Sequence, residues 1–140
     1  MAINLRTLTH SKTVYDGPAV AIMLPAVGGA MEVLPRHIPF ATLIDIGVVT
    51  ARREDGSLFE CTVSSGIAYL INDDLTIFAG AAETVEMIDL ERARTAAADA
   101  RRWMEEHRAD PVLRQAGLEL LRRAENRIRF VEKRKVRHGD

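Results

Sequence analysis

Cys61 and His37 are the only pair near the predicted sheet that nucleophilic catalysis could use. A cysteine hydrolase needs a base beside the thiol, a third group that orients the base, and donors that stabilise an oxyanion. The sequence marks neither of the last two. We therefore predict that the chain is not an enzyme and has no catalytic residue. His37, which lies between two prolines, is expected to fix a turn or contact a partner.

Metal binding has no support in the sequence. The remaining histidines are His10, His107 and His138, and their spacing with one another and with Cys61 does not match that of metal ligands. A single cysteine excludes an internal disulfide, which fits a reducing compartment. We expect no metal ion.

Phosphate binding through a glycine-rich loop is not indicated, because the chain has no Gly-x-x-x-x-Gly-Lys-Ser/Thr motif and no Gly-x-Gly-x-x-Gly motif after a strand. Side chains would have to hold any nucleotide, and guanidinium groups suit phosphate geometry. The candidates in the second half are Arg92, Arg101, Arg102, Arg122, Arg123, Arg127 and Arg129. The alternative interpretation is a solvated basic helix surface, the usual meaning of a run of like charges.

Charge is divided unequally along the chain, although the formal net charge is only -1. Residues 1–86 carry 5 basic and 10 acidic side chains, whereas residues 87–140 carry 14 and 10. A basic surplus without a dense patch and interleaved aromatics suits acidic protein surfaces or nucleotide phosphates, so we expect no nucleic-acid partner. No apolar run approaches the roughly 20 residues that span a bilayer, and the start lacks a signal peptide's apolar block, so we expect no membrane insertion.

The elements that must position these residues are strands in the first half. The start of the chain alternates like a strand, and further short apolar runs lie at 20–24, 40–44, 47–53, 57–63, 67–71 and 75–79. The Asp55-Gly56 pair and the segment 71–75 each predict a hairpin turn. Because aromatic residues make up only 5% of the chain, Val, Ile, Leu and Ala must fill most of the core. The larger side chains of the core are expected to be Phe40, Phe59, Tyr69 and Phe78.

The second half has helical periodicity. One apolar stripe runs through Leu90, Ala93, Ala97, Ala100 and Met104, with Ala96 on the same alanine-rich face, and a second runs through Leu113, Gly117, Leu120, Ala124, Ile128 and Val131. Between them, Asp110 can cap a helix that Pro111 opens. The predicted fold is α+β with two domains: an N-terminal antiparallel β-sandwich (1–86) followed by a C-terminal antiparallel two-helix hairpin (87–140). Because alanine buries little apolar area, the hairpin is either easily detached or closely packed.

Several short motifs occur in a specific order over nearly the whole chain. They are Val14-Tyr15-Asp16-Gly17, Gly29 followed by Val33-Leu34-Pro35-x-His37-x-Pro39, Asp45-Ile46-Gly47, Ser64-Ser65-Gly66-Ile67-Ala68, Asn72-Asp73-Asp74-Leu75-Thr76-Ile77 and Ile88-Asp89-x-x-Arg92-Ala93. In this order and spacing the chain resembles the epsilon subunit of F-type ATP synthase, called delta in mitochondria. The stretch 34–47 is most similar to cyanobacterial and chloroplast members.

The resemblance implies a noncatalytic rotor subunit of the central stalk that couples ion translocation to ATP synthesis. The sandwich would contact the gamma subunit and the c-subunit ring, with Leu34, Pro35, Arg36 and His37 at the partner interface. The hairpin would be an intrinsic inhibitor of ATP hydrolysis that, when extended, reaches the beta subunits; its basic second helix has the charge expected for their acidic surface. The implied location is peripheral, within F1 at the cytoplasmic face of the bacterial inner membrane.

The resemblance requires no cofactor, but it implies ATP as a regulatory ligand. The motif of ATP-binding bacterial members is matched by Ile88, Asp89, Arg92 and Ala93, with Glu83 just upstream, and Arg122 and Arg127 are expected to complete the site from the second helix. Asp89 also has a purely structural interpretation as a helix cap. A free-standing nucleotide sensor is therefore the second hypothesis, and a Cys61/His37 hydrolase the third.

The chain departs from the family at two positions. Many relatives have glycines beside the Leu-Pro segment, where this chain has Glu32 and Arg36. We expect the fold to survive and local contacts with gamma or the c ring to differ. The sequence leaves open the coupling ion, proton or sodium, and the position of the hairpin.

Overall fold

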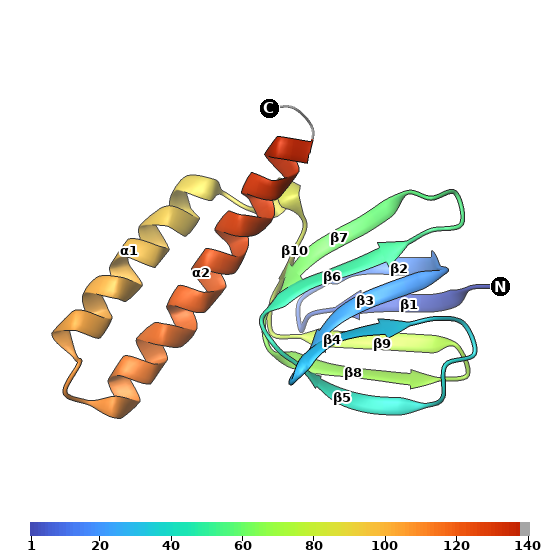
Figure 1. Ribbon diagram of the computed structural model, residues 1–140, viewed down its shortest axis with the longest axis horizontal. Helices are drawn as coiled ribbons and strands as arrows, with labels where there is room; N and C mark the ends of the chain where they lie inside the picture. The colour runs from blue at the N-terminus through green and yellow to red at the C-terminus, as the bar shows by residue number, and fades with distance from the viewer. Residues whose placement is uncertain (138–140) are drawn as a thin grey trace. The chain divides into compact units, whose positions relative to one another are not determined.

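The computed structural model describes residues 1–137, and the chain divides into two compact units between Thr84 and Val85 (Figure 1). The sequence placed this boundary after Glu86. The difference is a short 3₁₀ helix, η1 (Val85–Met87), which belongs to the second unit. His138 lies outside the described residues.

The first unit is a β-sandwich, as predicted. Its ten strands are β1 (Ile3–Leu8), β2 (Thr13–Ala19), β3 (Ala21–Ala26), β4 (Gly29–Val33), β5 (Phe40–Ile44), β6 (Gly47–Arg52), β7 (Leu58–Val63), β8 (Gly66–Ile71), β9 (Asp74–Ala79) and β10 (Ala82–Glu83). They follow the order β10-β7-β6-β3-β5-β8-β9-β1-β2 within residues 1–84, and β4 pairs with β3. The pairing is antiparallel except between β1 and β9, which run parallel.

Three strands, β2, β4 and the two-residue β10, were not among the predicted apolar runs. β2 contains Asp16, Gly17 and Pro18, which are turn residues by composition. Within residues 1–84, β2 ends the strand order and pairs with β1, so a proline without an N–H is tolerated at this edge. β4 begins at Gly29, which has a φ of 145° and follows Gly28 at 97°, so the two glycines supply the positive φ values of the turn between β3 and β4.

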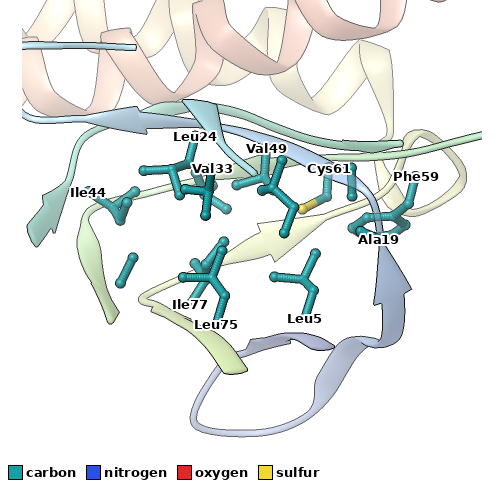
Figure 2. Close-up of a cluster of buried hydrophobic side chains, with 14 of the residues drawn as sticks. Leu5, Ala19, Leu24, Val33, Ile44, Val49, Phe59, Cys61, Leu75 and Ile77 are labelled. Carbon is teal, nitrogen blue, oxygen red and sulfur yellow. The ribbon is translucent and has the colours of Figure 1, made fainter. Parts of the chain in front are cut away.

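The sandwich core is aliphatic, and alternation along the strands builds it. Leu5, Leu24, Leu75 and Ile77 are fully buried, and Figure 2 shows the sulfur of Cys61 among such side chains. Period-2 alternation sends one face of each strand inward. This burial therefore follows from the sequence pattern.

The predicted aromatic core is only partly correct. Phe59 is buried, Phe40 is half-buried, and Tyr69 and Phe78 are exposed. Tyr69 and Phe78 occupy outward positions because their strand neighbours point into the core. Both residues therefore contribute to the surface of the sandwich.

Both predicted hairpin turns are present. Between β6 and β7, Gly56 has a φ of 86° and Arg53 N–H donates to the carbonyl of Ser57 at 2.8 Å. Between β8 and β9, Asn72 and Asp73 have φ values of 49° and 61° in a two-residue loop. Two successive positive φ values define the type I′ turn that suits tight hairpins.

The second unit is the predicted helical hairpin. Its helices are α1 (Leu90–Glu106) and α2 (Pro111–Arg137), which lie antiparallel and side by side (Figure 1). Asp110 caps α2, since its carboxylate accepts hydrogen bonds from the N–H groups of Val112 and Leu113 at 3.0 and 3.3 Å.

The buried stripes of the hairpin differ from the prediction at three positions. Ala93, Ala97 and Ala100 are buried in α1, and Gly117, Ala124 and Val131 are buried in α2. Ala96, Leu113 and Leu120 are exposed, and Leu120 retains 55% of its surface. Leu120, Ala96 and Ala100 border an open cavity, because the two alanines are too short to fill the space beside the leucine.

Candidate functional site

The predicted partner segment forms a loop between β4 and β5, called here the contact loop (residues 34–38). Its Leu34 and Ile38 side chains are exposed, Ile38 to 75%. The N–H of His37 donates to the carbonyl of Leu34 at 3.1 Å, and Arg36 between them has a φ of 69°. The loop therefore presents apolar and basic side chains from a tight turn.

An exposed apolar row lies on the outer face of three neighbouring strands. Leu43 of β5 pairs in register with Ile67 of β8, which pairs with Phe78 of β9. Their exposed fractions are 63%, 42% and 44%, and Tyr69 and Ile71 extend the apolar surface along β8. Contiguous exposed apolar surface of this kind usually marks a binding site.

Sequence reasoning missed this apolar row, although a signal was present. Residues 67–71 are apolar at every position, so β8 must be apolar on both faces. One face fills the core with Ala68 and Leu70, and the other is left outward. An uninterrupted apolar strand in an antiparallel sandwich therefore predicts a covered outer face.

Cys61 and His37 do not have the environment of a catalytic pair. Cys61 lies in the core, where burial raises the pKa of its thiol from 9.0 to about 12. The His37 ring lies in the contact loop, 5.2 Å from the ring of Phe40, and its Nδ1 is 2.8 Å from the carbonyl oxygen of Ile38. A buried neutral thiol is a poor nucleophile, so these positions argue against the hydrolase hypothesis.

No metal site is apparent in the part of the chain that the structure describes, since no three His, Cys, Asp or Glu side chains gather in residues 1–137. Among the same residues, no helix is long and apolar enough to cross a membrane.

The Ile88–Ala93 motif forms the start of α1. Asp89 is the N-cap: its carboxylate accepts a hydrogen bond from Arg92 N–H at 3.2 Å, and its carbonyl accepts one from Ala93 N–H at 3.0 Å. Ile88 is half-buried, Ala93 is buried, and Arg92 is exposed. The structural interpretation of Asp89 is thus confirmed in this geometry. Glu83 belongs to β10 in the first unit, where its carbonyl accepts a hydrogen bond from Thr62 Oγ1.

A cavity of about 460 Å³ lies between the two helices of the hairpin. Its lining comprises Ala96, Asp99, Ala100, Trp103, Leu120, Arg123 and Arg127. The Nε atom of Arg123 is buried and has no hydrogen-bond partner among the residues described. Trp103 is held in place, since its indole N–H donates to the carbonyl of Leu113 at 2.8 Å. The cavity thus combines an aromatic ring with two guanidinium groups.

The structure brings together only part of the predicted ATP site. Arg127 lines the cavity together with Arg123, whereas Arg122 is not among the lining residues and lies 3.9 Å from Glu119. Positions four apart share a helix face, and positions five apart point about 140° away from each other. On α1, the motif ends at Ala93, three residues and roughly 4.5 Å before Ala96 of the cavity lining, whereas Asp89 lies seven residues and roughly 10 Å before Ala96.

Several other arginines of the hairpin lie in ion pairs on its surface. Arg94 pairs with Glu91 and Glu132, and Arg101 pairs with Glu125. Exposed pairs contribute little to stability, which fits the solvated-surface interpretation for these arginines.

Known proteins resemble this chain over both units. A family model for the ATP synthase delta/epsilon chain, beta-sandwich domain, matches residues 2–85. The ATP synthase epsilon chain of Moorella thermoacetica is 34% identical over 122 residues, which cover 82% of this chain and 91% of the relative. That of Gloeobacter violaceus is 32% identical and covers 92% and 96%. That of Synechococcus elongatus is 35% identical over 96 residues, 69% of each chain.

A solved structure shows the same fold. A chain of the Euglena gracilis mitochondrial ATP synthase superposes with a TM-score of 0.78 and 24% identity, covering 89% of this chain and 78% of that one. The fold thus defines a class of two-domain chains, with a β-sandwich followed by a helical hairpin. Within this class, the chain belongs to the family of F-type ATP synthase epsilon chains, as the sequence motifs predict.

Proposed function

We propose that this chain is a noncatalytic rotor subunit of the central stalk, which couples ion translocation to ATP synthesis at the cytoplasmic face of the bacterial inner membrane. The observation that carries the proposal is the exposed apolar row of Leu43, Ile67 and Phe78. Covering such a row with a partner removes apolar surface from water, which favours association. The gamma subunit is the proposed partner at the row, and the c ring is the proposed partner at the contact loop.

A charge introduced into the row tests the gamma contact. In the full chain, Ile67→Glu would bury a carboxylate in the interface and is expected to weaken binding to the cognate gamma subunit by at least about tenfold. Leu58→Glu is a matched control, because Leu58 on β7 has a similar exposed fraction of 45% and lies outside the row. Equal binding by the two variants would refute the assignment of the row to gamma.

We propose that the hairpin inhibits ATP hydrolysis through contact with the beta subunits. Support comes from its separation as a compact unit and from its basic side chains. The test is ATP hydrolysis by the cognate alpha-beta-gamma head, reconstituted with the full chain or with a chain truncated after Met87. Inhibition by the full chain alone supports the proposal, whereas equal turnover with both bound chains refutes it.

ATP is the proposed regulatory ligand of the hairpin. The observation that favours it is the cavity in which Trp103 could stack on a base while Arg123 and Arg127 face phosphate groups. Trp103 is the single tryptophan of the chain, so its fluorescence reports ligand entry directly. We expect ATP to change this fluorescence in the wild-type chain and Arg127→Gln to weaken the response.

Two further variants locate the ATP site. Arg108→Gln removes an exposed arginine that pairs with Glu105 and lies outside the cavity, so it should leave the fluorescence response unchanged. Arg92→Ala tests the motif: loss of the response would place the motif in the site, and an unchanged response would restrict binding to the cavity. If ATP does not change the fluorescence of the wild-type chain at millimolar concentration, the nucleotide proposal is wrong.

A further inference from the structure

Residues 34–37 in the contact loop form a β-turn that has an arginine at a position with positive φ. The N–H of His37 donates to the carbonyl of Leu34, which closes the turn, and Pro35 and Arg36 are its two central residues. Proline fixes a negative φ at the first central position, and Arg36 has a φ of 69° at the second. A positive φ at the second central position alone defines a type II turn, which normally places glycine or asparagine there.

A carboxylate from a distant segment binds this turn. The Oδ1 atom of Asp73 accepts a hydrogen bond from the backbone N–H of Arg36 at 2.8 Å. Asp73 is itself anchored, because it is the second residue of the type I′ turn between β8 and β9, and its carbonyl accepts the N–H of Asn4 at 2.8 Å. The carboxylate thus projects from a fixed point onto the central peptide of the loop.

This hydrogen bond discriminates between the two common forms of the turn. Types I and II differ by a flip of the central peptide, here the bond between Pro35 and Arg36. In the observed form the Arg36 N–H faces Asp73. In the flipped form the Pro35 carbonyl would turn toward the carboxylate, and two acceptors would then face each other. Asp73 therefore favours the form that Arg36, a non-glycine residue, would otherwise disfavour.

We propose that Asp73 is the positioning residue of the contact loop: its carboxylate holds the Leu34–His37 turn in the type II form and thereby sets the directions of the Arg36 and His37 side chains toward the partner. The consequence for binding rests on the proposed function, whereas the consequence for the loop does not. Asp73 acts through the Arg36 backbone. Its hydrogen bond offsets the cost of a positive φ at a residue that is not glycine.

Asp73→Gly is the decisive variant, made in the full chain. Glycine accepts the positive φ of position 73, so the β8–β9 turn is retained while the carboxylate is lost. Asp74→Asn is the control, because it removes one negative charge at the neighbouring position. It leaves the hydrogen bond from the Arg36 N–H to the Asp73 carboxylate in place. A second pair of variants, Arg36→Gly and Arg36→Gly/Asp73→Gly, repeats the comparison with glycine at position 36. Glycine adopts the positive φ of this position without help from the Asp73 carboxylate.

The first readout is amide hydrogen exchange at Arg36, measured by NMR on the free chain. Exchange should be slowed in the wild type and in Asp74→Asn, and it should accelerate about tenfold or more in Asp73→Gly. Unchanged exchange in Asp73→Gly would overturn the inference, whether or not the chain binds any partner.

The second readout is affinity for the cognate complex of gamma and the c ring. Asp73→Gly should weaken binding by about tenfold in the Arg36 background, but by less than about twofold when position 36 is glycine. Equal loss in both backgrounds would show that Asp73 touches the partner itself, and no loss in either would show that the turn form is irrelevant; either result overturns the positioning role. If the wild type does not bind, the proposed function fails, and the exchange at Arg36 alone decides the inference.

Discussion

Gly117 of α2 lies against Trp103 of α1 so closely that a Cβ atom added to Gly117 would come within 2.7 Å of Trp103 Cδ1. The same atom would lie 2.6 Å from Met104 Cγ. Trp103 cannot easily move aside, because its indole N–H binds the Leu113 carbonyl and its ring stacks on His107 at 3.9 Å. This contact sets how closely the two helices approach at the closed end of the hairpin.

Gly117→Ala should therefore destabilise the hairpin. Helix propensity alone favours alanine over glycine by about 1 kcal/mol, but overpacking at a fixed contact costs about 1–3 kcal/mol. We expect the overpacking to prevail and the hairpin to melt at lower temperature, as measured by Trp103 fluorescence and helical circular dichroism. Gln115→Ala, at an exposed position two residues away, should have little effect; an equally stable hairpin in Gly117→Ala would contradict the close contact.

The buried Cys61 thiol should be inert in the native state. Its pKa is raised from 9.0 to about 12 by burial, so the folded chain keeps the thiol neutral where the unfolded chain ionises it. The resulting stability is complete below pH 9.0 and is lost as the pH rises toward about 12. We expect the urea midpoint to fall over this range less steeply in Cys61→Ala than in the wild type. Reaction of native Cys61 with a thiol-specific disulfide reagent at pH 8 would contradict the burial.

Asp55 should titrate below its ordinary range in the β6–β7 turn. The Ser57 hydroxyl and the Ser57 N–H both donate to its carboxylate, and these hydrogen bonds lower the pKa of Asp55 from 3.8. A lowered folded pKa stabilises the native state above pH 3.8, and this stabilisation is lost as the pH falls through the folded value. Ser57→Ala should move the Asp55 titration, followed by NMR, back toward 3.8. Ser65→Ala, at an exposed serine elsewhere, should leave it unchanged.

Sequence periodicity was sufficient to predict the sandwich and the hairpin, because strand and helix patterns are local. It placed Ala93, Ala97 and Ala100 on the buried face of α1 and Asp110 at the start of α2. Local pattern was insufficient where an environment depends on distant segments. It could not show that Phe78 faces outward beside Ile67, which is a matter of strand pairing.

The candidate sites were harder to predict for the same reason. Whether Arg122 or Arg123 lines the cavity depends on the rotation of α2 about its axis, which tertiary packing decides. The link between Asp73 and Arg36 joins two turns that are 37 residues apart, and neither turn motif indicates the other. Motif resemblance identified the family because the order of motifs is preserved even where single contacts are not visible in the sequence.

Asp89 offers a way to separate stability from ligand binding in the hairpin. Its carboxylate caps α1 by accepting the Arg92 N–H, so Asp89→Ala should destabilise the helix by about 1 kcal/mol. Serine is an equally good cap, so Asp89→Ser should restore the helix content measured by circular dichroism while removing the negative charge. If Asp89 serves only as a cap, the Trp103 fluorescence response to ATP in Asp89→Ser will equal that of the wild type. If the response is lost although the helix is intact, Asp89 contacts the nucleotide, and the site must extend from the cavity to the start of α1.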